Sequence, residues 1–232
     1  RLNTDYVDLF LIHWPDPNIP ISESMLALRD LIDAGKIRYA GVSNFLPDRL
    51  TEARKTLDIV ADQAGYNFLD RRIEREIIPH CEREGIGVMA YGSLAHGLLT
   101  GTMSSDTKFE ESDWRSSGHA FGLPLFKGDH FMENLDAVRR LSEIASREGQ
   151  NIATLASAWV LRNPVVTVSL IGFRRPEEID DAIKVAEWKL SDSLIDEVDT
   201  ISREAFERLY ADHDFDPMDG PPNPENPSPS KL

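Results

Sequence analysis

Polar or small residues follow several apolar segments of the sequence, at positions where strands would end. They are His13, Ser43 with Asn44, Gln63, Tyr91 and Gly172. A histidine can exchange a proton, and hydroxyl and amide groups can orient a ligand by hydrogen bonds. A lone histidine at a strand end is more often structural than catalytic. A packed core, however, has no use for polar groups at several strand ends together, so we expect a site there.

Short apolar strands alternate with amphipathic helices along the chain. We predict strands at 6–13, 38–44, 60–67, 86–92 and 165–172. The first four recur at roughly the 25–30 residues of a βαβ unit, which predicts a parallel sheet in a barrel or a doubly wound fold. In a barrel the active site lies at the carboxyl ends of the strands. Alternation along the first strand places Asp8 on the face opposite to His13, so Asp8 is not expected to be its partner.

Helices are predicted between these strands, with Gly35 and Gly85 ending the first and third. Residues 93–130 form a long loop without periodicity, which is usually functional when it follows a strand. Two helices follow the loop. A helix after the fifth strand is expected to turn Ile179, Ile183 and Ala186 inward, and Ser191 is expected to cap the last helix. We assign 1–213 to one barrel-like domain and 214–232 to a disordered tail rich in proline and aspartate.

The composition is that of an ordinary globular protein, with 41% hydrophobic and 28% charged residues. A net charge of −15 argues against nucleic acid or an anionic membrane as a partner. The apolar runs are too short for a membrane span, and the single cysteine, Cys81, fits a reducing cytoplasm. The abrupt start at Arg1 leads us to expect a fragment. We assign no metal ligands, and the composition does not indicate an oligomeric state.

Five motifs resemble those of aldo-keto reductases in their order and spacing. They are LNTDYVDLFLIHWPD, GKIRYAGVSNF, QAGYN, GIGVMAYGSLAHGLLTG and IGFRRPEEIDDA. The resemblance extends from Arg1 to about Ile201. It implies a TIM-type (β/α)8 barrel, here incomplete, with about strands 4 to 8 present and the first three β/α units missing. It also implies an oxidoreductase that reduces a small-molecule aldehyde or ketone, or oxidises the alcohol, by hydride transfer with NADP(H).

The resemblance assigns roles to the residues at the strand ends. His13 matches the family's histidine, which would donate a hydrogen bond to the carbonyl oxygen. Ser43, Asn44 and Gln63 match the residues that hold the nicotinamide carboxamide, and Tyr91 matches the aromatic residue that stacks on the nicotinamide ring. The backbone of the following turn would approach the pyrophosphate, through Gly92, Ser93, Leu94, Ala95 and Gly97. The plainer alternatives are a core aromatic for Tyr91 and a turn or helix cap for Ser43 and Asn44.

The adenine end departs from the family pattern. The residues in question are Gly172, Phe173, Arg174, Glu178 and Asp181. Gly172 and Arg174 fit a Gly-x-Arg signature, and Arg174 with Arg175 would pair with a 2′-phosphate, which favours NADP(H) over NAD(H). Glu178 stands where the family usually has glutamine or arginine, and Asp181 begins a pair that replaces the usual Glu-Asn. The alternative is that the two arginines are simply solvated ahead of a helix.

The catalytic Asp, Tyr and Lys of the family belong to strands upstream of Tyr6, and no tyrosine here matches the general acid by motif. We therefore expect the chain alone to be inactive. A different class of function is also open, namely a nicotinamide-binding regulatory or accessory subunit of aldo-keto reductase type that does not turn over.

Overall fold

The computed structural model describes residues 2–211. They form two compact units, which are considered separately. The first comprises 2–65, 73–91 and 164–168, and the second comprises 66–72, 92–163 and 169–211. No helix within the described range is long and apolar enough to cross a bilayer. The tail predicted for 214–232 lies outside this range.

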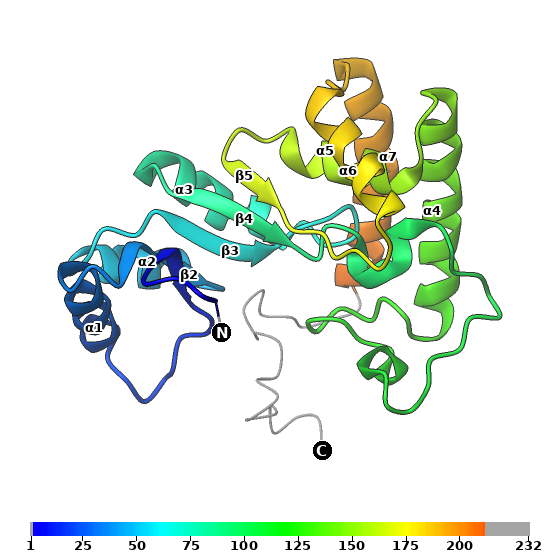
Figure 1. Cartoon of the computed structure of the whole chain (residues 1–232). Coiled ribbons are helices and arrows are strands. Elements are labelled where there is room, and N and C mark those ends of the chain that lie inside the picture. The colour runs from blue at the N-terminus through cyan, green and yellow to red at the C-terminus, as the bar shows by residue number, and fades with distance from the viewer. Residues whose placement is uncertain (1, 212–232) are drawn as a thin grey trace. The chain divides into compact units, whose positions relative to one another are not determined.

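Five strands form one sheet in the order β1-β2-β3-β4-β5 (Figure 1). Their bounds are β1 (Val7–Ile12), β2 (Ile37–Ser43), β3 (Ala61–Gly65), β4 (Gly87–Tyr91) and β5 (Val166–Ser169). The strands are parallel and alternate with helices, as the sequence pattern predicted. Parallel pairing in sequence order brings the carboxyl ends of β2, β3 and β4 to the same edge of the sheet.

In the first unit, proline and glycine residues mark helix ends. The helices are α1 (Ile21–Asp33), α2 (Pro47–Arg54) and α3 (Ile77–Glu84), and a short 3-10 turn, η1 (Arg72–Glu74), precedes α3. Pro47 occupies the first turn of α2, where its missing N–H costs nothing. Gly85 ends α3 with φ +67°, a left-handed conformation that glycine adopts freely.

One face of the sheet is covered, and the other is closely packed around Gly41 of β2. On the covered face Ala40, Val42, Ala64 and Val88 are each at most 2% exposed. On the opposite face Leu11 of β1 lies over Gly41 of β2. A Cβ on Gly41 would lie 2.4 Å from Leu11 Cδ2 and 2.9 Å from the carbonyl oxygen of Ala61, so only glycine fits this position.

The second unit is helical. Its α-helices are α4 (Gly128–Arg147), α5 (Ile152–Leu161), α6 (Glu177–Glu187) and α7 (Asp192–Ala211), and its 3-10 turns are η2 (Ala95–Thr100) and η3 (Trp114–Ser117). Asn151 caps α5 by accepting a hydrogen bond from the Thr154 N–H at 2.8 Å. Ser191 caps the last helix, as expected, by accepting one from the Leu194 N–H at 3.3 Å.

The prediction for the buried face of α6 was wrong. Ile179 is 45% exposed and Ile183 is 59% exposed, and Ala186 is exposed as well. Val185, which is 8% exposed, is buried instead, and α6 packs against α5. The side of α6 that packs against α5 is therefore not the side that carries Ile179, Ile183 and Ala186.

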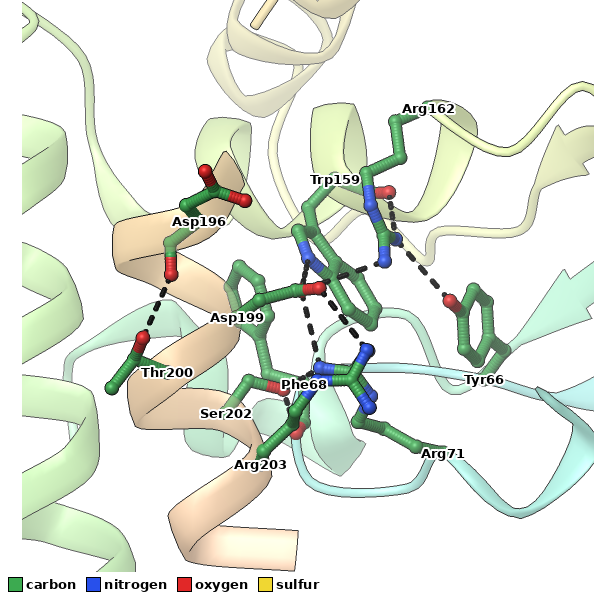
Figure 2. A network of polar contacts seen from close by, with 10 residues as sticks. All are labelled: Tyr66, Phe68, Arg71, Trp159, Arg162, Asp196, Asp199, Thr200, Ser202 and Arg203. Atoms are coloured by element: carbon green, nitrogen blue, oxygen red, sulfur yellow. Dashed lines mark hydrogen bonds and ion pairs between the residues drawn. The ribbon is translucent and has the colours of Figure 1, made fainter. Parts of the chain in front are cut away.

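An aromatic core with ionic partners stabilises the second unit (Figure 2). The guanidinium groups of Arg162 and Arg71 lie 3.8 Å and 4.9 Å from the centroid of the Trp159 ring. Asp199 of α7 accepts hydrogen bonds from Trp159 Nε1 at 2.7 Å and from Arg71 at 3.1 Å. Burial opposes ionisation of Asp199, but these donors keep its pKa below the ordinary value.

Candidate cofactor site

The first unit brings four of the predicted residues to one edge of the sheet. Ser43 of β2 lies opposite Gln63 of β3 in the strand register, and Gly65 lies opposite Tyr91 of β4. Asn44 directly follows β2. The carboxyl ends of three neighbouring strands therefore present a hydroxyl, two amides and a phenol together.

Hydrogen bonds link three of these side chains. Ser43 Oγ donates to the carbonyl oxygen of Gln63 at 2.9 Å, and Asn44 Nδ2 donates to Ser43 Oγ at 2.9 Å. The Tyr91 hydroxyl donates to Asn44 Oδ1 at 2.9 Å. Asn44 has φ +59°, which asparagine tolerates better than most residues. The arrangement fixes both ends of the Asn44 amide.

This geometry also bears on the purely structural roles considered for Tyr91, Ser43 and Asn44. Tyr91 is half-buried and its hydroxyl is engaged, so it is not a core aromatic. Helix α2 has Leu46 at its N-cap and no side-chain cap, so neither Ser43 nor Asn44 caps it. The left-handed Asn44 does make a turn between β2 and α2.

A buried acid that the sequence analysis overlooked lies behind this turn. Asp62 precedes Gln63 on β3, points to the covered face of the sheet and is 0% exposed. Burial raises its pKa to about 8, although the nearby backbone N–H groups of Phe45 and Asn44 lower it in part. Neither carboxylate oxygen accepts a hydrogen bond of normal geometry from the described residues. An acid in a segment that is otherwise typical of a buried strand was the available signal.

His13 directly follows β1 and is exposed. Its ring lies 5.8 Å from that of Trp14, centroid to centroid. Asp8 forms an ion pair with Arg38 of the neighbouring strand at 2.7 Å, in agreement with the expectation that it does not serve His13.

In the second unit the predicted pyrophosphate turn contains four residues with positive φ. Gly92, Ala95, His96 and Gly97 have φ values of +65°, +44°, +56° and +102°. The Ala95 N–H donates to the Gly92 carbonyl at 2.7 Å, which closes the turn. Ser93 and Ala95 are fully buried, and Leu94 is half-buried. Glycine is favoured at 97 by its φ of +102°, which other residues rarely adopt, and a Cβ there would also lie 3.1 Å from Met103 Cε and 3.3 Å from Arg115 Nη1.

A cleft of about 500 Å³ lies beside this turn. It is lined by His96, Glu110, Ser112, Asp113, Trp114, Arg115 and Arg174. Arg174 was predicted as a cofactor residue, whereas the other six residues of this lining were not predicted. The 93–130 loop was expected to be functional, but it has no periodicity from which individual residues could be chosen. An arginine beside acidic and aromatic residues, in ESDWRSS, was the available signal for Arg115.

Charges in the cleft are already paired in part. Arg115 donates through Nε and Nη2 to the two oxygens of Asp113, at 3.0 and 2.6 Å, and through Nη1 to the carbonyl of His96 at 3.1 Å. These bonds lower the pKa of Asp113 to about 2. Burial lowers the pKa of His96 to about 4; the positive charges of Arg115 and Arg72 lower it further, against the opposing effect of Asp70. His96 is therefore neutral at pH 7.

The segment before α6 holds the remaining predicted residues. Gly172 and Phe173 are exposed, and Phe173 is 45% exposed. Glu178 accepts hydrogen bonds from the Arg174 backbone N–H at 2.8 Å and from Arg175 Nε at 3.3 Å, and the first of these contributes most to a lowered pKa of Glu178. Asp181 lies within α6. Glu178 thus pairs with Arg175, the residue that follows the cleft residue Arg174.

Comparison with known proteins places the chain in a family. A sequence model described as the Aldo/keto reductase family matches residues 1–203. The chain belongs to the aldo/keto reductase family. It is 37% identical to the aldo-keto reductase YhdN of Bacillus subtilis (strain 168) over 87% of this chain and 60% of that protein. It is 31% identical to the NADH-specific methylglyoxal reductase of Escherichia coli (strain K12), over 90% of this chain and 62% of that protein.

A solved aldo/keto reductase structure resembles this fold. The glycerol dehydrogenase AKR11B4 from Gluconobacter oxydans superimposes with a TM-score of 0.82 at 35% identity, over 93% of this chain and 63% of that one. The five parallel strands alternating with helices therefore match an aldo/keto reductase structure over part of its length. The chain spans about 60% of the length of the curated relatives named above.

Proposed function

We propose that the protein is an oxidoreductase that transfers hydride between NADP(H) and a small aldehyde or ketone. We further propose that this chain corresponds to about strands 4 to 8 of the (β/α)8 barrel, without the first three units. Family membership supports the reaction class. The names of two relatives, a methylglyoxal reductase and a glycerol dehydrogenase, support small carbonyl compounds or the corresponding alcohols as substrates.

The observation that carries this proposal is the polar set at the ends of β2, β3 and β4. NADP(H), when bound, supplies or accepts the hydride. Ser43, Asn44 and Gln63 offer donors and acceptors that match those of a carboxamide. Tyr91 offers an aromatic ring beside them, and its hydroxyl is linked to Asn44. These residues fit the nicotinamide end of the cofactor and would fix the orientation of its ring.

The cleft of the second unit fits a phosphorylated ligand. Arg174 and Arg115 contribute two guanidinium groups, and the backbone of the Gly92–Gly97 turn allows close approach. The acids Glu110 and Asp113 offset part of this positive charge, and Glu178 engages Arg175. We therefore propose NADP(H) as the preferred cofactor, by a modest margin over NAD(H).

His13 would donate a hydrogen bond to the substrate carbonyl and stabilise the charge that develops on its oxygen. A proton must still be transferred to that oxygen, and no tyrosine in the chain matches the family's general acid by motif. Tyr66, for example, is fully buried and its hydroxyl accepts a hydrogen bond from Arg162 at 3.2 Å. The proposal therefore predicts cofactor binding without turnover by the 232-residue chain.

Fluorescence titration with NADPH and NADH tests the proposal. The wild type should bind both and bind NADPH more tightly. Arg174→Ala should remove most of that difference while leaving NADH binding nearly unchanged. Arg139→Ala is the matched control, because Arg139 is exposed and forms ion pairs with Asp136 and Glu143 on the surface of α4. Reduction of 4-nitrobenzaldehyde by the chain alone, or failure to bind either nucleotide, would contradict the proposal.

A further inference from the structure

The segment Tyr66–Arg72 lies between β3 and α3 and is firmly held within the second unit. Asn67 and Asp70 exchange backbone hydrogen bonds of 3.1 Å in both directions, which closes a tight turn. Phe68 and Leu69 within the turn are fully buried. Arg71 donates to Asp199 and Ser202 of α7, and Ser202 Oγ donates back to the Phe68 carbonyl at 2.7 Å (Figure 2). The segment is thereby anchored to the helical core.

Two side chains of this anchored segment form hydrogen bonds with the loop that lines the cleft. Asn67 Nδ2 donates to the Gly92 carbonyl at 3.0 Å, where the loop begins. Arg72 Nη1 donates to the Phe121 carbonyl at 3.0 Å, far along the loop. At the same time, the Asp70 carboxylate accepts two hydrogen bonds from Arg72, at 2.7 Å from Nε and at 2.6 Å from Nη2. This bidentate pair is nearly buried, so the direction of the remaining Arg72 donor is fixed.

Phe121 connects Arg72 to residues that line the cleft. Its φ of +49° is uncommon for a large residue, and the bond from Arg72 to its carbonyl supports that conformation. Its ring stacks on His96 with centroids 4.9 Å apart. His96 in turn meets the edge of Trp114 at 5.2 Å and accepts the Arg115 hydrogen bond through its carbonyl. His96, Trp114 and Arg115 all line the cleft, whereas Arg72 does not.

We propose that Arg72 is a positioning residue for the phosphate-binding cleft. It acts through Phe121 and His96, and its own position is set by Asp70 and by the anchored segment. This inference rests on the proposed function for the identity of the ligand, but not for the contact path itself. Loss of the Phe121 contact should let His96, Trp114 and Arg115 shift relative to Arg174, and NADPH affinity should fall.

The test uses Arg72→Lys, because lysine keeps a positive charge beside Asp70 and avoids leaving a buried carboxylate unpaired. Lysine cannot bind both Asp70 oxygens and also reach the Phe121 carbonyl. The variant should bind NADPH about tenfold more weakly, the effect of losing one hydrogen bond that involves a charged group. Arg139→Lys, an exchange of the same kind on an exposed ion pair of α4, should bind normally.

A second readout does not depend on the cofactor. The chain has four tryptophans, so labelling with 5-fluorotryptophan gives four fluorine resonances, and Trp114→Phe assigns the one of interest. Arg72→Lys should shift or broaden the Trp114 resonance and leave the other three in place. Phe121→Leu, which leaves the Asp70–Arg72 pair intact, should affect the same resonance.

The outcomes separate the two proposals. A selective Trp114 change with weaker NADPH binding supports the positioning role. The same selective change in a chain that binds neither nucleotide also supports it, while overturning the proposed function. An unchanged Trp114 resonance, or equal shifts of all four tryptophans, would show that Arg72 has no positioning role or only a general structural one.

Discussion

Asp62 predicts an unusual dependence of stability on pH. Its carboxyl is fully buried and accepts no hydrogen bond of normal geometry from residues 2–211, and burial raises its pKa from 3.8 to about 8. At pH 7 the folded chain therefore keeps this proton, whereas the unfolded chain releases it. Because the folded state binds more protons, the free energy of unfolding falls as pH rises from 3.8 toward 8. Stability is fully retained below the unfolded pKa and is lost as pH approaches the folded one.

The size of the effect follows from the shift. Each pH unit within this window costs about 1.4 kcal/mol, so the penalty grows by about 3 kcal/mol between pH 5 and pH 7. Asp62→Asn removes the titrating proton while keeping the shape of the side chain. Its free energy of unfolding should therefore be flatter with pH than that of the wild type, and the variant should gain about 3 kcal/mol relative to the wild type over this interval.

Urea unfolding followed by circular dichroism at pH 5, 6, 7 and 8 measures this difference. Asp33→Asn is the control, since Asp33 is an exposed residue of α1 whose curve should parallel that of the wild type. Other ionisable groups contribute equally to both curves and cancel in the comparison. Parallel pH profiles for the wild type and Asp62→Asn would mean that the buried carboxyl does not hold its proton at neutral pH, contrary to this prediction.

Three further predictions follow from buried or crowded positions. Burial and then the charge of the nearby acid raise the pKa of Cys81 to about 12, so a disulfide reagent at pH 8 should modify it only after unfolding. With its pKa lowered to about 4, His96 should show a C2 proton resonance that is constant from pH 8 to pH 5.5, and a midpoint near 6.5 would contradict its burial. Gly41→Ala should destabilise the chain by about 1–3 kcal/mol in thermal unfolding because its Cβ would collide with Leu11, whereas Gly172→Ala, with open space around it, should not.

The parts of the fold that depend on local chemistry could be predicted from sequence. Glycine after α1 and α3, and Asn151 before α5, act within a few residues of the helix ends that they define. The buried side of α6 could not be predicted in the same way. The apolar stripe with Ile179 and Ile183 shows which residues could be buried, but the partner helix decides which side is buried.

The residues of the candidate site also divide into those that the local sequence predicts and those that depend on distant contacts. Ser43, Asn44 and Tyr91 could be selected because parallel strands bring their carboxyl ends together whatever the loops do. His96 and Arg115 could not, because the cleft joins them to Arg174 across many intervening residues, and their loop has no repeating pattern. Asp62 could not be selected because its apolar neighbours are typical of a covered strand, and a single acid among them does not change that pattern.

We propose that Ser43, Asn44, Gln63 and Tyr91 together form the nicotinamide site. Saturation-transfer NMR with NADP⁺ tests it directly, because the method reports which ligand protons contact the protein. The wild type should transfer saturation to both the nicotinamide and the adenine protons. Tyr91→Ala should lose most of the nicotinamide signal and keep the adenine signal. Equal nicotinamide signals in the wild type and in Tyr91→Ala would contradict this assignment of the nicotinamide site.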